Sequence, residues 1–353
     1  MNRKLVAAVM VAGALAGRDA RAQERFALEG ERVAVYNLAG QVNVEPGSGS
    51  AVTVLVTRGG SGAGRLTIRR GEADGARTLA VVYPGDRIVY PAMGRWTNTN
   101  FEVRDDGTFG NNAAARLFGG GGRRVRISGA GDGLQAWADV RVQVPAGRTV
   151  SIHQGVGRVD VANVNGDLRV KTAAAEIRAA GTRGTLNLDT GSGGIVLRDA
   201  QGDISLDTGS GGVHADNVSG RVLDVDTGSG GVEGAGIRVE RLHVDVGSGG
   251  VRLDAVDARD VDIDTGSGSV NLRLAADAET VRIDTGSGGV VLAIPSQFGA
   301  DADIDTGSGG IHVLVPAQVT RASRDHFTGR LGDGHGRLVI DTGSGGVRVV
   351  SDN

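Results

Sequence analysis

The chain has 353 residues, a formal net charge of −3, no cysteine and only 3% aromatic residues. Its charge is unevenly divided: residues 151–353 carry 18 basic against 28 acidic side chains, whereas residues 23–150 carry 16 against 12. The acidic second half argues against nucleic acid as its partner, and the absence of cysteine excludes disulfide bonds and a lipidated cysteine.

Residues 1–22 are predicted to form a secretory signal peptide. Arg3 and Lys4 give it a basic start, residues 5–17 an apolar stretch, and residues 20–22 (Ala-Arg-Ala) a cleavage site flanked by small side chains. The apolar stretch is too short to span a membrane. We therefore expect a bacterial protein exported to the periplasm or cell surface, with no integral membrane segment after cleavage.

Residues 23–150 are predicted to form an irregular β region that caps the repeats, because short apolar or alternating segments lie between glycine-rich turns. Within it, residues 92–135 are rich in glycine and asparagine and are predicted to form a long loop. Four aromatic side chains of this loop are expected to cap an open end of the repeats rather than to contact a ligand. They are Trp96, Phe101, Phe109 and Phe118.

Residues 151–353 repeat a unit that contains the hexamer Asp-Thr-Gly-Ser-Gly-Gly or a close variant. Its aspartates recur every 18 to 21 residues, with a final step of 36. They are Asp189, Asp207, Asp226, Asp245, Asp264, Asp284, Asp305 and Asp341. In the unit at 261–280, apolar and polar residues alternate on both sides of the Gly/Ser run, which predicts two strands joined by a tight turn. A period near 19 predicts one such unit stacked on copies of itself.

The predicted fold is therefore all-β: a single-chain parallel β-solenoid of about 19 residues per coil, right-handed as is usual for parallel crossovers. Successive coils are expected to pair strand on strand about 4.8 Å apart, with their aliphatic side chains stacked in a narrow core. His153 and Lys171 stand 36 and 18 residues before Asp189, so about ten coils are expected from residue 151 onward. The long final step contains an insertion at about 318–336, which is expected to loop out of the stack.

The polar residues of the turns are given structural roles in this interpretation. Glycine is expected where the turn takes a positive φ, a requirement that recurs in every stacked coil. The aspartate side chain is expected to bond turn amides and so to end the strand. The predicted turn glycines are Gly191, Gly209, Gly228, Gly247, Gly266, Gly286, Gly307 and Gly343.

The eight aspartates also form a candidate calcium ladder, because stacked carboxylates attract a cation and Gly/Asp repeats bind calcium in nonapeptide β-rolls. The nine-residue period of those rolls is absent here, so a structural role is preferred and no cofactor is expected. A second, weaker candidate metal site lies in the insertion, where an exposed polar loop is the alternative. Its residues are Asp325, His326, Asp333 and His335.

No catalytic residue is predicted. LNLDTGS at 186–192 matches the aspartic protease motif superficially, but those enzymes bring two carboxylates together from two lobes or subunits. A regular ladder of eight copies does not provide that arrangement. No nucleophile elbow, phosphate-binding loop or zinc-protease motif occurs, and the outward positions show no aromatic platform for a polysaccharide.

The chain resembles the DUF4097 family. The resemblance rests on ADVRVQVPAG at 138–147, the DTGSGGV units that follow, and VYNLAGQVNVEPG at 35–47, and it covers most of residues 30–350. Departures from the pattern are Val246 in place of threonine, Ser269 in place of glycine, and the glycine-rich 92–135 stretch. The resemblance implies a β-solenoid, described in that family as an adhesin domain, and it supplies no catalytic residues to carry over.

Together these observations predict a non-catalytic, exported β-solenoid protein that serves as a structural or adhesin-like binding scaffold of the bacterial envelope. Its expected partner is an envelope protein or a glycan. Two alternatives stay open: a carbohydrate-active β-helix enzyme and a calcium-dependent solenoid scaffold.

Overall fold

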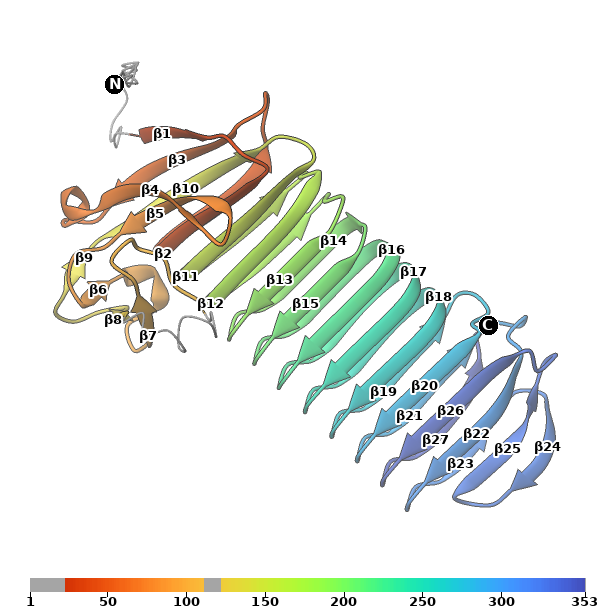
Figure 1. Ribbon diagram of the computed structural model, residues 1–353. Helices are drawn as coiled ribbons and strands as arrows, with labels where there is room; N and C mark the ends of the chain where they lie inside the picture. Colours follow the sequence, from red (N-terminus) through yellow and green to blue (C-terminus); the bar gives the residue numbers. More distant parts are fainter. Residues whose placement is uncertain (1–22, 111–121, 353) are drawn as a thin grey trace.

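The computed structural model describes residues 23–110 and 122–352, so the predicted signal peptide and Phe118 lie outside the described residues. The described chain is all-β apart from two short 3-10 turns, η1 (Ala63–Arg65) and η2 (Pro91–Met93). As predicted, parallel strands stack into a long solenoid (Figure 1). Within the described ranges, no helix has the length and apolar character needed to cross a membrane.

The solenoid is built from parallel strands paired in register. They are β2 (Arg32–Pro46), β11 (Arg148–Ala162), β12 (Gly166–Ala180), β13 (Leu186–Thr190), β14 (Ile195–Gln201), β15 (Ile204–Thr208), β16 (Val213–Thr227), β17 (Val232–Val246), β18 (Val251–Thr265), β19 (Val270–Leu274), β20 (Thr280–Thr285), β21 (Val290–Ile294), β22 (Ala300–Thr306), β23 (Ile311–Val313), β26 (Gly336–Thr342) and β27 (Val347–Ser351).

Three parallel ladders run along the stack. The first contains the segment before each Gly/Ser turn, as in β13 against β15. The second contains the segment after the turn, as in β14 against β16. A third and shorter ladder, which the alternation pattern did not predict, pairs residues 237–239 with residues 256–258. From His153 to Asp305 the first ladder holds ten rows in the described residues, in agreement with the predicted number of coils.

Aliphatic side chains fill the space between the ladders. Of the unit at 261–280, Val261, Ile263, Val270 and Leu272 are at most 2% exposed, as their alternation predicted. Burial of such side chains contributes about 1.5–3 kcal/mol each. Each coil shares this burial with the coils on either side, so a coil is stable only when it is stacked on its neighbours.

At the far end of the stack, the order of coils in space differs from their order in the chain. Strand β26 lies between β20 and β22, and β27 lies between β21 and β23. The coil at 337–351 is therefore inserted between two coils that precede it in the sequence (Figure 1). The spacing of the repeats gives the length of each coil but does not say which coils lie next to each other. This order was therefore not predicted.

The insertion at 318–336 does not loop out of the stack as predicted. Strands β24 (Ala317–Ala322) and β25 (His326–Leu331) form an antiparallel hairpin, and β25 pairs in turn with β22. The hairpin covers backbone groups at the edge of the first ladder that would otherwise be open to strand addition. Its alternation was hard to detect because Gly329 separates the inward residues Phe327 and Leu331.

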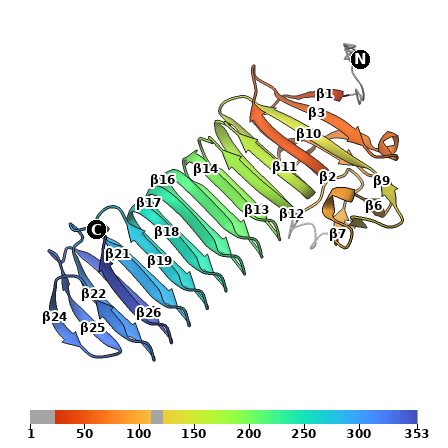
Figure 2. The same cartoon turned by 180° about the vertical axis from the view of Figure 1, so that it is seen from behind.

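An antiparallel group precedes the stack and covers its other end, which lies away from the C-terminal hairpin in both views (Figures 1 and 2). Strands β1 and β10 flank β3, β10 also pairs with β2, and a hairpin of β4 and β5 extends from β2. Their bounds are β1 (Gln23–Leu28), β3 (Val52–Gly59), β4 (Thr67–Ala73), β5 (Ala76–Val82) and β10 (Trp137–Val144).

The 92–135 stretch, predicted to be a loop, contributes strands to a second sheet. This sheet, called here the accessory sheet, consists of β7 (Asn98–Val103), β8 (Arg123–Ser128), β6 (Arg87–Val89) and β9 (Leu134–Gln135) in that order. Phe101 and Phe109 are buried and pack edge to face, and Phe109 packs likewise on Tyr36 of β2. These two aromatics therefore pack on the outward side of β2, where Tyr36 lies, and not over an open end of the stack as expected, and Trp96 is 91% exposed.

The turn glycines are required for a reason other than the predicted one. None of the eight, Gly191 through Gly343, has a positive φ. Instead, stacked turns approach so closely that a Cβ on Gly228 would lie 2.5 Å from the carbonyl oxygen of Gly209. Positive φ occurs at a different corner of the coil, for example at Asn217 and Gly236. Close backbone contact between coils therefore selects glycine in the hexamer.

Candidate functional site

The repeated aspartates form a row along the outside of the first ladder. Because the coils pair in register, each aspartate lies beside the one in the next coil, about 4.8 Å away. We call this row the aspartate column. In spatial order it contains Asp189, Asp207, Asp226, Asp245, Asp264, Asp284, Asp341 and Asp305.

The threonine next to each aspartate, and not the aspartate itself, closes the turn. In the described residues, no aspartate of the column bonds a turn amide, so that prediction is wrong: the aspartate lies on the outer face of the strand. Thr227 is buried on the inner face, where its hydroxyl accepts a hydrogen bond from Gly230 N–H (3.0 Å) and donates one to Gly211 O of the preceding coil (3.1 Å). Equivalent pairs of bonds occur at Thr190, Thr208, Thr265 and Thr306.

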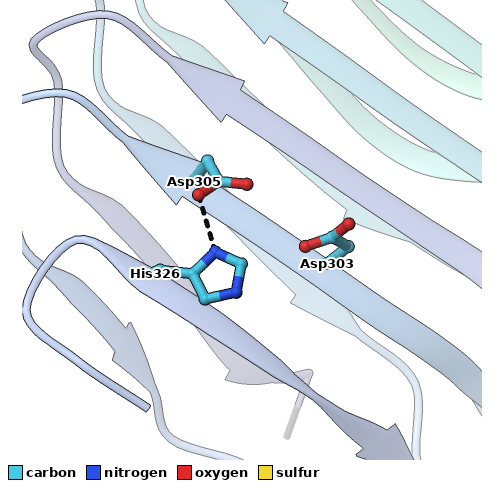
Figure 3. A group of neighbouring side chains, drawn as sticks. All are labelled: Asp303, Asp305 and His326. Atoms are coloured by element: carbon cyan, nitrogen blue, oxygen red, sulfur yellow. Dashed lines mark hydrogen bonds and ion pairs between the residues drawn. The ribbon is translucent and has the colours of Figure 1, made fainter. Parts of the chain in front are cut away.

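A cationic or ionisable partner stands at each end of the aspartate column. Lys171 Nζ lies 2.9 Å from Asp189 Oδ2 at one end. At the other end, His326 Nδ1 lies 2.7 Å from Asp305 Oδ1 (Figure 3). Lys171 is visible in the repeat spacing, 18 residues before Asp189, but His326 lies on the antiparallel hairpin and has no such signal.

The interior of the column has few counter-charges. Arg282 approaches Asp284 to 3.6 Å, whereas Asp207, Asp226, Asp245, Asp264 and Asp341 form no ion pair with any residue that the structure describes. Elsewhere on the solenoid, neighbouring coils often present opposite charges, as in Arg221 with Asp203 and Arg238 with Asp257. The column is therefore a continuous anionic stripe.

The electrostatic effect of this stacking appears in the pKa values of two members. Burial is the largest cause that raises the pKa of Asp207, followed by the charges of Asp189 and Asp226. The pKa of Asp264 is raised in the same way, by burial and then by Asp284 and Asp245. In both cases the folded chain holds the proton more tightly than the unfolded chain.

We expect Asp264→Asn to raise the melting temperature slightly at pH 7, by about 1 °C. A raised folded-state pKa gives stability that is fully present below the unfolded-state value and is lost as pH rises through the folded-state value. At pH 7 the wild type has lost this stabilisation, and the amide removes the charge that causes the loss. At pH 3 the two proteins should melt together.

Thermal melts of both proteins at pH 7 and pH 3 check this expectation. Glu240→Gln is the control, because Glu240 is exposed, lies off the column and forms no ion pair with the described residues. A lower melting temperature for Asp264→Asn at pH 7 would show that the charge contributes favourably to the fold.

Among the residues that the structure describes, a group able to hold a metal ion lies at the far end of the column. Asp303, Asp305 and His326 each offer a ligand atom, and these atoms lie within 4.8 Å of one another (Figure 3). Carboxylate oxygens and an imidazole nitrogen suit divalent cations. The structure divides the predicted histidine cluster of the insertion between two histidine–aspartate contacts, since His326 contacts Asp305 while His335 contacts Asp333. Calcium along the whole column stays a prediction.

The outward row continues beyond Asp189 through Lys171 to His153 and Tyr36. The rings of His153 and Tyr36 stack with their centroids 4.3 Å apart. Burial, and then the charges of Lys171 and Arg169, lower the pKa of His153 to about 4, so it is neutral at physiological pH. The anionic stripe thus begins at Asp189.

Two hollows of the described surface are shallow and open to solvent. One hollow lies over the third ladder and is lined in part by Arg238, Asp257, Arg259 and Glu279. These residues neutralise one another, with N–O distances of 3.2 Å for Arg238–Asp257 and 2.8 Å for Arg259–Glu279. Paired in this way, they are poorly suited to exchange protons with a substrate.

Comparison with known proteins agrees with the architecture. No curated protein sequence matches the chain. Among solved structures, it is similar to the crystal structure of a proposed cell adhesion protein from Clostridium sporogenes ATCC 15579, at 10% identity over 94% of this chain and 99% of that chain. The TM-score of 0.19 is too low for this likeness to carry an argument. The sequence profile described as Toastrack DUF4097 matches residues 140–350, more than half of the chain. The chain therefore belongs to the DUF4097 family, as its repeats indicated.

Proposed function

We propose that the protein is a non-catalytic, exported scaffold of the bacterial envelope that binds its partner along the aspartate column. The observation that supports this proposal is the continuity of the stripe: Asp207, Asp226, Asp245 and Asp264 follow one another in register without counter-charges. A partner with regularly spaced cationic or hydrogen-bond-donor groups gains one contact per coil. Several weak contacts on one rigid support combine into strong binding.

The rigidity of the support favours binding over chemistry. The spacing of the carboxylates is fixed by the parallel ladder beneath them, so a matching partner finds them already arranged. Envelope proteins and glycans both offer repeated donor groups of this kind. Export is supported by the basic, apolar and small-residue segments of residues 1–22.

Neutralising part of the column tests the proposal. Beads coated with the protein are incubated with bacterial envelope fragments, and the apparent affinity is compared with that of the Asp226→Asn/Asp245→Asn/Asp264→Asn variant. We expect a loss of about tenfold or more, because three adjacent charges are removed. A variant with the same change in net charge, Glu29→Gln/Asp132→Asn/Glu240→Gln, alters exposed carboxylates off the column and should bind like the wild type.

Two other results of this experiment would contradict the proposed role of the aspartate column. Equal loss in both triple variants would mean that overall charge, and not the column, governs binding. Loss of wild-type binding in a chelator, restored by calcium, would replace the metal-free scaffold with the calcium-dependent one.

A further inference from the structure

The outward face of the accessory sheet carries a group of arginines. Arg87 of β6 lies directly beside Arg126 of β8, and Arg124 lies two residues before Arg126 on the same face. Their neighbours Ile88, Val125 and Ile127 are fully buried on the opposite face of the sheet, so the three arginines are outward and exposed. We call Arg87, Arg124 and Arg126 the arginine face.

The arginine face lacks the ion pairs that are common on the solenoid. The carboxylates nearest to it in register and sequence are Glu102, opposite Arg124, and Asp86, next to Arg87. Within the described chain, neither forms an ion pair with the three arginines. On the solenoid, in contrast, Arg221, Arg238 and Arg259 each lie within 3.2 Å of a carboxylate oxygen.

An exposed indole stands at the end of the same sheet. Trp96 is 91% exposed and lies in the turn between η2 and β7. This turn is held against the end of β8, because Gly129 N–H donates a hydrogen bond to Thr97 O (3.1 Å). Arg95, next to Trp96, is exposed and forms no ion pair with a described residue. The backbone of the turn that carries Trp96 is thus attached to the sheet that bears Arg124 and Arg126.

We propose that the arginine face and Trp96 form a docking surface for an anionic phospholipid bilayer. Arginine binds phosphate oxygens through several N–H donors, and a cationic surface is attracted to anionic headgroups. An exposed tryptophan is suited to the headgroup level, because its ring is apolar and its N–H is polar. The sheet and the turn attached to it thus offer the two kinds of interaction that hold a peripheral protein at a membrane.

The shape of the surface favours a bilayer over a glycan chain. The arginines project from a sheet face. A shallow hollow at the sheet's β6–β9 side includes Arg87 and is lined in part by Arg65, Asp86 and Asp132. Glycan sites usually provide a groove and several aromatic rings, whereas Trp96 is the single strongly exposed aromatic side chain among the described residues. A planar anionic partner fits these features better.

The position of the accessory sheet gives the docked molecule an orientation. The sheet lies at the end of the stack opposite the hairpin of β24 and β25 (Figures 1 and 2). The solenoid is acidic, with 28 acidic against 18 basic residues from 151 onward, so an anionic bilayer repels it. The aspartate column is then held away from the lipid surface. This inference does not depend on the column being a binding site.

Vesicle binding tests the inference. The chain from residue 23 onward, which excludes the predicted signal peptide, is titrated with phosphatidylcholine vesicles that contain either no anionic lipid or about 30% phosphatidylglycerol. We expect tight, salt-sensitive binding to the anionic vesicles only. Arg87→Ser/Arg124→Ser/Arg126→Ser should weaken it roughly 100-fold, or about fivefold for each arginine.

Matched variants separate the surface from net charge. Arg221→Ser/Arg238→Ser/Arg259→Ser changes the net charge equally and should retain most of the binding. Trp96→Phe should abolish the blue shift of tryptophan fluorescence that wild type shows on binding, since the other tryptophan, Trp137, is partly buried against the core. Equal weakening in both arginine variants, equal binding to neutral vesicles, or binding to dextran sulfate without binding to vesicles would each overturn the inference. Unchanged circular dichroism melts confirm that the variants are folded.

Discussion

Gly230→Val should lower the free energy of unfolding by about 3 kcal/mol and the melting temperature by about 5 °C or more. A Cβ at this position would lie 1.8 Å from the carbonyl oxygen of Gly211 and 2.3 Å from its carbonyl carbon. Both atoms are backbone, so no rotamer change relieves the overlap. The turn must move away from the coil beneath it, and the hydrogen bonds between those coils lengthen or break.

Thermal and urea melts followed by circular dichroism measure this effect. Gly64→Val is the matched control, because Gly64 is an exposed glycine with no atom within 4 Å of a Cβ at its position. The control should melt close to the wild type. If Gly230→Val also melted there, close packing of the turns could not be what selects glycine.

Thr227→Val should destabilise the stack by about 2–4 kcal/mol. Valine has nearly the shape of threonine, so the core stays filled, but Gly230 N–H and Gly211 O both lose their partner inside the protein. A buried polar group without a hydrogen bond typically costs about 1–3 kcal/mol. Urea melts of the two proteins give the difference directly.

In one coil of the protein, valine already replaces the threonine of the hexamer. Val246 occupies the threonine position and is fully buried there, so valine fits the site sterically. Val246→Thr should therefore raise stability by about 1 kcal/mol, by supplying a hydroxyl to Gly249 N–H and Gly230 O. Destabilisation by this substitution would argue that the hydroxyl pair does not cross-link the coils.

The solenoid was predictable because its physics is local and repeated. The alternation of apolar Val261 and Ile263 with polar residues identifies the inner face of the strand. The hexamer aspartate recurs from Asp189 onward at nearly constant spacing, which implies that successive coils pair in register. Together these two signals were enough to place the core and the aspartate column. They could not distinguish the buried threonine, which closes the turn, from the adjacent aspartate, which does not.

The accessory sheet and the contact of His326 with Asp305 have no repeating sequence pattern that could have predicted them. The accessory sheet is assembled from short segments separated in the chain, such as Arg87–Val89 and Asn98–Val103, so no window of sequence reveals it. The signal at 123–127 was the alternation of arginine with valine and isoleucine, which is typical of a strand with one buried face. The partnership of His326 with Asp305 depends on an antiparallel pairing that residue spacing does not indicate.

The placement of β26 and β27 between earlier coils affects how the solenoid unfolds. A simple solenoid frays from its ends, one repeat at a time, because each repeat contacts only its neighbours. Here the outermost coil, β22 and β23, is joined to the rest through β26 and β27. Release of that inserted coil would detach the outer coil and its hairpin with it. The far end should therefore open as one cooperative unit of several strands, and amide hydrogens throughout it should exchange at a common rate.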